Sequence, residues 1–148
     1  MDVRFQLASE KDLPRLLELM REFYQEQEMV FDEEVARSGL RKTLLDPGLG
    51  SAYLILLEQE LSGYFVITFC FSLEFHGKFA LLDELYLRAP FRRQSLGSSA
   101  MEFAEEICRK IGIKALRLEV GEVNKAAQSL YESAGLKRDA RYLFTKWI

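Results

Sequence analysis

Apolar residues along the chain follow two different spacings, and together these predict a mixed α/β fold. Short alternating or continuous apolar runs predict strands at 2–8, 51–58, 78–88 and 114–120. Segment 59–75 is expected to turn at Ser62-Gly63 and to continue as a long strand. Apolar residues at helical spacing predict helices at 9–28, 31–48, 95–111 and 124–135, with Asp32 and Asn124 as N-caps. The last segment, 136–148, is expected to add one or two strands.

The order of these elements is β-α-α-β-β-β-α-β-α-β, which limits the topology. The helix at 95–111 connects strands 78–88 and 114–120 by a right-handed crossover, so these two strands are expected to be parallel. The hairpins before them predict antiparallel pairs. We therefore expect an α/β domain over residues 1–148, with a mixed, mostly antiparallel sheet, one parallel pair and helices on both faces.

Composition excludes several classes of protein. No apolar run approaches the roughly 20 residues of a membrane span, and the first residues lack the features of a signal peptide. A net charge of −3 argues against a nucleic-acid partner. Cys70 and Cys108 lie in apolar settings and are interpreted as reduced thiols of a cytoplasmic protein. The one histidine, His76, precedes Gly77 and is interpreted as a turn residue, so no metal site is expected.

The stretch FRRQSLGSS, residues 91–99, joins a predicted strand to a predicted helix. Such a turn exposes backbone N–H groups at the positive end of the helix dipole, where phosphates bind. Gly97 has no Cβ and lets a ligand approach, while Arg92 and Arg93 add positive charge. On this stretch alone, a simple capped helix remains an alternative, and the nucleotide P-loop pattern is absent.

Longer motifs surround this turn. Residues 81–87 read LLDELYL, 92–97 read RRQSLG, 118–120 read LEV, and 124–131 read NKAAQSLY. These blocks resemble the acetyl-CoA-binding half of the GCN5-related N-acetyltransferase (GNAT) superfamily, and ASEKDLPRLLEL at 8–19 is similar to its first helix. The resemblance covers nearly the whole chain and is strongest from 82 to 136. It implies a GNAT-like fold, with the parallel pair as strands four and five, and acetyl-CoA as co-substrate.

The resemblance also implies which residues contact coenzyme A. The turn would hold the pyrophosphate, the strand before it would offer backbone groups to the pantetheine amides, and the last helix would line the same arm. The residues so implied are Leu85, Tyr86, Leu87, Arg92, Arg93, Gln94, Ser95, Leu96, Gly97, Ser98, Asn124, Ala127 and Tyr131. Ser95 and Leu136 depart from the family pattern, which has glycine and phenylalanine there. Serine keeps its amide, so the cost is small unless Ser95 needs a positive φ.

Acetyl transfer to an amine needs a base for the amine and benefits from an acid for the thiolate. The resemblance implies Tyr131 as the acid; packing on the core is the alternative. Three carboxylates are candidates for the base: Glu84, then Glu119, then Asp83. Strand alternation predicts that Asp83 and Glu84 point to opposite faces. Each of the three is alternatively a core acid paired with an arginine.

The acids Glu28, Glu33 and Glu74 are expected to attract a cationic amine, so a small-molecule amine is the predicted acceptor; a merely solvated face is the alternative. Two other functions remain open: acetylation of a protein N-terminus or lysine, and a non-catalytic acyl-CoA-binding module.

The apolar, aromatic ending RYLFTKWI completes the sheet or pairs with another subunit. Because many relatives dimerise, a homodimer is expected.

Overall fold

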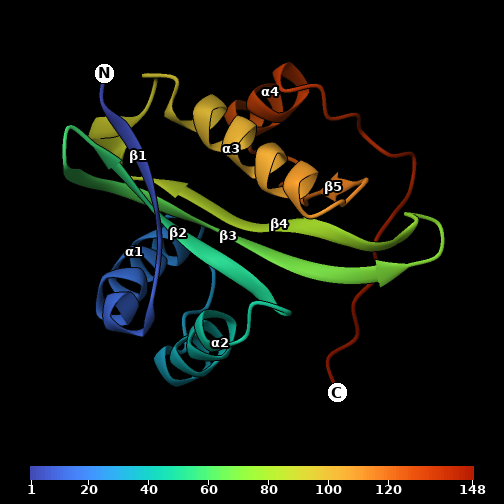
Figure 1. Ribbon diagram of the computed structural model, residues 1–148, viewed down its shortest axis with the longest axis horizontal. Coiled ribbons are helices and arrows are strands. Elements are labelled where there is room, and N and C mark those ends of the chain that lie inside the picture. Colours follow the sequence, from blue (N-terminus) through green and yellow to red (C-terminus); the bar gives the residue numbers. More distant parts are fainter.

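The computed structural model describes residues 1–148 and contains a five-stranded mixed sheet (Figure 1). The strands, in spatial order, are β1 (Val3–Leu7), β2 (Gly50–Leu57), β3 (Glu60–Ser72), β4 (Gly77–Leu87) and β5 (Leu116–Arg117). The first four pair antiparallel and β4 pairs parallel with β5. The helices are α1 (Leu13–Glu26), α2 (Glu33–Leu45), α3 (Leu96–Lys110) and α4 (Lys125–Ser133), with short 3-10 turns at Glu10–Asp12 and Ala89–Phe91. The predicted fold class is confirmed.

Helices cover both faces of the sheet, with α1 and α2 on one and α3 and α4 on the other (Figure 1). Strand β3 supplies both hydrophobic cores because its side chains alternate between the two faces. Tyr64 and Val66 belong to the core under α1 and α2, whereas Phe65 and Ile67 belong to the core under α3. The central strands are therefore apolar on both sides, and a charged side chain among them needs a partner or a cleft.

The helix ends follow from local capping. The Asp32 side chain accepts hydrogen bonds from the N–H groups of Glu34 and Val35 at the start of α2. The Asn124 side chain accepts one from the N–H of Ala127 at the start of α4 (3.1 Å). These contacts satisfy donors that the first helical turn leaves free, and both predicted N-caps are confirmed.

The hairpin between β2 and β3 turns at Glu58 and Gln59, not at Ser62-Gly63 as the sequence suggested. Gly63 lies inside β3, and a Cβ there would come within 2.1 Å of the Tyr86 carbonyl oxygen. The glycine thus serves the close approach of two strands. Ser62 is buried, and its hydroxyl donates to the Ile55 carbonyl at 2.9 Å beside a bulge.

The C-terminal segment, residues 136–148, forms none of the strands expected there, so that prediction is wrong. Strand β5 pairs parallel with β4 as predicted, but it is only two residues long where 114–120 was expected. The segment leaves α4, passes the free edge of the sheet and ends on the side of α2 (Figure 1). Ion pairs hold it across that edge, from Arg141 to Glu74 and from Arg117 to Asp139. Because β5 offers so short a ladder, these contacts rather than strand pairing place the segment.

Both cysteines are free thiols; Cys108 is buried and Cys70 is partly buried. His76 lies in the β3–β4 turn with φ 64°, as expected of a turn residue. None of the helices combines the length and the apolar character that crossing a bilayer demands.

Candidate active site

The sheet opens between β4 and β5. The two strands pair only at Ala80 with Leu116 and at Leu81 with Arg117. Beyond Leu81, β4 continues to Leu87 without a neighbouring strand on that side. The second half of β4 therefore borders a gap in the sheet, where no strand separates the two faces.

The backbone of β4 turns hydrogen-bonding groups toward this gap, and that of Leu85 is unused while the Leu87 carbonyl accepts from Arg92. The Arg88 N–H donates to the Ser62 carbonyl of β3 at 2.9 Å. Because hydrogen bonds alternate in direction along an antiparallel strand, the backbone of Tyr86 also faces β3, and that of Leu85 and Leu87 faces the gap. Of the three residues expected to meet pantetheine through their backbone, Leu85 and Leu87 are turned the right way and Tyr86 is not.

The turn from β4 to α3 leaves backbone donors free. The first hydrogen bond of α3 runs from the Ser99 N–H to the Ser95 carbonyl (3.0 Å), and the N–H groups of Leu96, Gly97 and Ser98 have no acceptor. These donors point out of the N-terminal end of a 15-residue helix, where the helix dipole also favours an anion. The arrangement fits the phosphate groups of coenzyme A.

The polar side chains of this turn differ in what they contact. Arg92 forms an ion pair with Glu26 of α1 (2.6 Å) and donates to the Leu87 carbonyl (2.8 Å). Gln94 donates to the carbonyl of Pro90 (3.1 Å). Arg93 is exposed and has no ion-pair partner. Arg92 and Gln94 therefore stabilise the turn, and Arg93 is the side chain whose charge is available to a ligand.

Ser95 adopts the left-handed conformation, with φ 65° and ψ 13°, and its side chain makes no capping hydrogen bond. The backbone here needs the positive φ that glycine adopts without steric cost. The substitution of serine for the family's glycine therefore places a strained residue at the start of α3.

We expect Ser95→Gly to raise the free energy of unfolding by about 0.5–1 kcal/mol. Relief of the left-handed strain gains about 1.5 kcal/mol, and the extra freedom of glycine in the unfolded chain costs about 0.5–1 kcal/mol. The melting temperature should rise by about 1–4 °C. The control Ser98→Gly, inside α3, should lower it, because glycine weakens a regular helix. Equal melting temperatures for wild type and Ser95→Gly would contradict this account.

Gly97 is buried where α3 meets α4. A Cβ at this position would lie 2.8 Å from Cδ2 of Leu130. The structure thus explains Gly97 first through the approach of two helices, whereas the sequence suggested the approach of a ligand. A larger residue at 97 would displace α4, which carries Tyr131, so its effect on ligand binding would be indirect as well as direct.

Glu84 is the candidate base whose carboxylate accepts hydrogen bonds from other side chains. Its Oε1 accepts a hydrogen bond from the Tyr64 hydroxyl of β3 (2.7 Å), and its Oε2 accepts one from the Tyr24 hydroxyl of α1 (2.5 Å). Burial raises the pKa of Glu84 above its usual range, the two phenols oppose that shift, and the neighbouring Asp83 adds to it. No arginine or lysine pairs with Glu84, so it is not the arginine-paired core acid considered above.

A bulge in β4 decides which way Glu84 points. Leu82 and Glu84 pair with adjacent residues of β3, which leaves Asp83 without a partner. Leu82 packs in the core under α3, while Glu84 contacts Tyr64 in the core under α1. In a regular strand residues 82 and 84 would share one face. Strict alternation therefore fails between Leu82 and Glu84, because the extra residue turns Glu84 toward α1.

Asp83 and Glu119 flank the gap. Asp83 is exposed as a residue, but its carboxylate lies among protein atoms at the bulge, and this desolvation raises its pKa. The negative charge of Glu119, in the exposed segment after β5, raises that pKa further. The charge of Glu119 thus raises the pKa of Asp83, and the charge of Asp83 raises that of Glu84, but only Glu84 is held by hydrogen bonds.

Tyr131 of α4 lies on the opposite side of the sheet from Glu84. It packs against the core under α3, and burial raises the pKa of its phenol. It also lines a groove of about 1090 Å³ together with Glu119 and Leu81. Tyr131 therefore lies on the α3 side of the sheet, and Glu84 lies on the α1 side.

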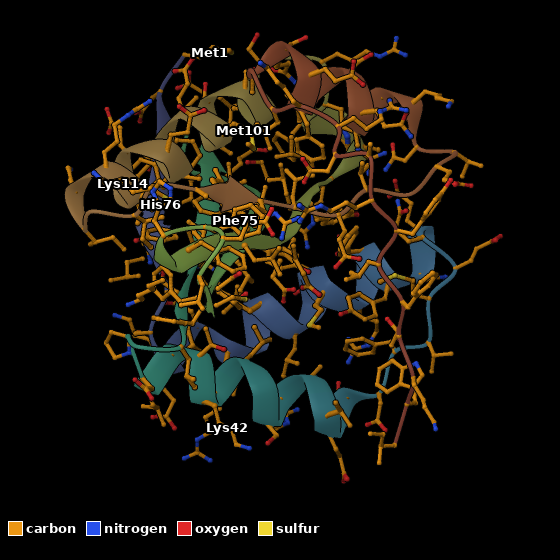
Figure 2. The ribbon with its side chains drawn as sticks, turned by 90° about the vertical axis from the view of Figure 1, so that its right-hand side faces the viewer. Met1, Lys42, Phe75, His76, Met101 and Lys114 are labelled. Carbon is orange, nitrogen blue, oxygen red and sulfur yellow. The ribbon has the colours of Figure 1, made fainter.

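The acids expected to attract the substrate do not gather in one place. Glu33 forms ion pairs with Arg21 and Arg37, and Glu74 pairs with Arg141. Glu74 belongs to the β3–β4 turn, whose Phe75 and His76 stand at the end of the molecule that faces the viewer in Figure 2. The strand from Gly77 to Glu84, about 23 Å of extended chain, separates this turn from Glu84. Glu28, next to the end of α1, is exposed and has no ion-pair partner.

Tyr24 and Tyr64 are the site residues that the sequence analysis missed. Tyr24 follows Met20 by four residues on the apolar face of α1, and a phenol on a buried face needs a hydrogen-bond partner. That signal could have identified Tyr24 as a candidate. Tyr64 offered no signal, since an aromatic residue in a central strand is ordinary.

Three comparisons describe what this chain is similar to. The sequence model described as "Acetyltransferase (GNAT) family" matches residues 13–136. The chain is 27% identical to a thialysine N-epsilon-acetyltransferase of Bos taurus, covering 86% of this chain and 80% of that protein. It is 29% identical to an aminoalkylphosphonate N-acetyltransferase of Salmonella typhimurium, covering 78% and 73%.

A solved integron cassette protein from the mobile metagenome of Cole Harbour Salt Marsh has the same fold, with a TM-score of 0.87 and 30% identity over 97% of this chain and 90% of that one. The family match spans the open edge of β4, the free amides of α3 and the helix of Tyr131. This protein therefore belongs to the GNAT family and is an acetyl-CoA-dependent N-acetyltransferase.

Proposed function

We propose that this enzyme moves the acetyl group of acetyl-CoA to the primary amine of a small cationic molecule, by direct attack in a ternary complex. The observation that carries the proposal is Glu84, a carboxylate without a cationic partner, held by two phenols on the acceptor side of the gap. The small amines in the names of the bovine and Salmonella relatives support it. The free thiols suit the cytoplasm as its location.

The residues that would hold coenzyme A are those with unused polar groups. The free N–H groups of Leu96, Gly97 and Ser98 suit the pyrophosphate, with Arg93 adding charge. The open backbone of Leu85 suits the pantetheine amides, as an added strand would. Asn124 uses its side-chain oxygen as a helix cap, which leaves its amide N–H groups for the same arm.

Two side chains would handle protons. A primary alkyl amine has a pKa near ~10.4, so making it neutral at pH 7 costs about 4–5 kcal/mol. Glu84 would accept that proton, directly or through water. Acetyl-CoA supplies the activated thioester, and Tyr131 would donate a proton to the sulfur from the opposite side of the gap. Asp83 and Glu119 rank below Glu84 as bases because no hydrogen bond holds either carboxylate at the gap.

The electrostatic attraction proposed for the substrate rests mainly on Glu28. Ion pairs with arginines offset the charges of Glu33 and Glu74. Glu28 forms no ion pair and lies in the connection between α1 and α2, two residues after the end of α1 and five before the start of α2. Salt screens such a surface charge within about 8–10 Å, so the KM for the amine should rise modestly with ionic strength.

The direct test is release of free CoA thiol from acetyl-CoA across a panel of acceptors. The panel contains an aliphatic diamine, thialysine, an aminoalkylphosphonate, peptides with a free N-terminus or lysine, and a neutral amine-free control. We expect turnover with one of the small amines and kcat/KM at least about tenfold above that of the peptides. Turnover confined to the peptides would overturn the small-amine proposal and favour protein acetylation. The long groove beside Tyr131 and Glu119 would then be the place for an extended chain.

We also propose that two copies pair through the C-terminal segment. Tyr142, Leu143, Phe144, Trp147 and Ile148 are all largely exposed in one copy. An aromatic side chain buries about 150–250 Å². Reciprocal cover of these five side chains in both copies would therefore reach the roughly 1,200 Å² of a stable interface.

Trp147 is the only tryptophan of the chain and is 93% exposed, so its fluorescence reports on this pairing. We expect its emission to shift to the blue as protein concentration rises, in step with a doubling of mass in sedimentation equilibrium. Trp147→Lys should keep the protein monomeric. A monomer with red-shifted emission at every concentration would contradict the proposed dimer.

A further inference from the structure

The carboxylate of Glu84 accepts hydrogen bonds from phenols of two different elements. Tyr64, on the neighbouring strand β3, is fully buried, so its hydrogen bond to Oε1 belongs to the core. Tyr24 belongs to α1 and is only partly buried, and its hydroxyl reaches Oε2 from the helix side. The two oxygens of one carboxylate are thus fixed separately, one by the sheet and one by α1.

The ring of Tyr24 is itself held in place. It packs edge-to-face against Phe23 (centroids 5.8 Å apart) and against Phe31 (5.6 Å), which lies in the connection from α1 to α2. These contacts use the ring and leave the hydroxyl for Glu84. The rotamer of Tyr24 is therefore set by aromatic packing, and the direction of its O–H follows from that packing.

The charges around Glu84 would by themselves discourage its ionisation. Asp83 is its neighbour in β4, Glu119 stands behind Asp83 on the β5 side, and no cation pairs with Glu84 from any element. A hydrogen bond donated to a carboxylate favours the ionised form. The phenols of Tyr24 and Tyr64 are the only groups that oppose this burial and repulsion through a direct hydrogen bond.

We infer that Tyr24 is a positioning residue for the proton-accepting carboxylate, because its hydroxyl orients Oε2 of Glu84 and its hydrogen bond favours the ionised form. The inference rests on the proposed function, in which Glu84 takes the proton of the amine. Helix α1 then helps to orient the base, since the packing of Tyr24 against Phe23 and Phe31 sets the direction of the hydroxyl that holds Glu84.

The test is the pH profile of Tyr24→Phe, a change that keeps the ring and its two aromatic contacts. Removal of one hydrogen bond to a charged group should raise the pKa of Glu84 by about 1–2 units. The acidic limb of kcat/KM then moves to higher pH by that amount. Below the limb kcat/KM falls about 10- to 100-fold, and at pH 9 it approaches the wild-type value. A structural role alone would lower kcat/KM by the same factor at every pH, and this result would overturn the inference.

Tyr53→Phe is the matched control. Tyr53 stacks on Phe65 on the opposite face of the sheet, and its hydroxyl makes no hydrogen bond within the protein. Its removal should leave the limb of the profile in place. A shift in this control equal to that of Tyr24→Phe would also overturn the inference.

A second measurement separates this inference from the proposed function. The carboxyl carbon of Glu84 can be titrated by NMR in both proteins, with its signal assigned by its loss in Glu84→Gln. A higher midpoint in Tyr24→Phe together with a shifted acidic limb supports both the inference and the proposed function. A higher midpoint with an unmoved limb would reject Glu84 as the base, and the inference would then fall with the proposed function. Equal midpoints in the two proteins would overturn the inference whatever the activity.

Discussion

Glu84→Gln is expected to lower kcat/KM for the amine about 100- to 10,000-fold at pH 7, the range of one acid–base contribution. Glutamine keeps the shape of the side chain, and its oxygen can still accept one of the two phenolic hydrogen bonds. What it loses is the ability to take a proton. The KM for acetyl-CoA should remain unchanged, because the proposed cofactor groups lie in the turn to α3 and along the edge of β4.

The loss of activity in Glu84→Gln should depend on pH. As the pH approaches that of amine ionisation, near ~10.4, more of the substrate is already neutral and the enzyme's base matters less. The deficit of Glu84→Gln should therefore shrink at alkaline pH. Asp83→Asn and Glu119→Gln serve as controls and should each cost less than Glu84→Gln. A larger loss in Glu119→Gln would move the base to the α3 side of the sheet, next to Tyr131.

Tyr131→Phe is expected to lower kcat about 10- to 1000-fold with little change in the affinity for acetyl-CoA. Phenylalanine preserves the ring that packs in the core under α3, so the fold and the groove that residue 131 lines should persist. The change removes only the hydroxyl that would protonate the sulfur. Because burial raises the pKa of Tyr131, the wild-type phenol stays protonated through neutral pH and is ready to act as an acid.

Tyr142→Phe is the control for Tyr131→Phe. Tyr142 lines the same groove from the C-terminal segment but is 88% exposed. Loss of its hydroxyl should leave kcat unchanged. If instead Tyr131→Phe retained the wild-type kcat, Tyr131 would be a packing residue and the thiolate would leave without a proton from this side chain.

Much of the site could be placed from the sequence because its signals are local. A strand followed by a basic turn and an amphipathic helix predicts the free amides of Leu96, Gly97 and Ser98. Asn124 predicts the start of α4, and therefore the position of Tyr131 along that helix. Each of these signals depends on a few neighbouring residues, whose backbone geometry varies little between proteins.

Other features depended on contacts between distant segments. The positive φ of Ser95 and the packing of Gly97 on Leu130 depend on how α3 sits against its neighbours. The bulge at Asp83 is visible only in the pairing of β4 with β3. The partners of Glu84 lie 60 and 20 residues away in the sequence, at Tyr24 and Tyr64.

The sequence by itself determined the helices with their caps, the parallel crossover and the family pattern of the cofactor turn. These follow from hydrophobic periodicity and from backbone groups that must be satisfied within one or two turns of chain. Only the tertiary structure decided that Glu84 faces α1 between two phenols and that Glu33 and Glu74 form ion pairs with arginines. It also decided that residues 137–148 cross the edge of the sheet without forming a strand. The physical reason is that side-chain direction after a bulge, ion pairing and strand addition are set by what lies across the sheet, and alternation along one strand carries no information about its neighbour.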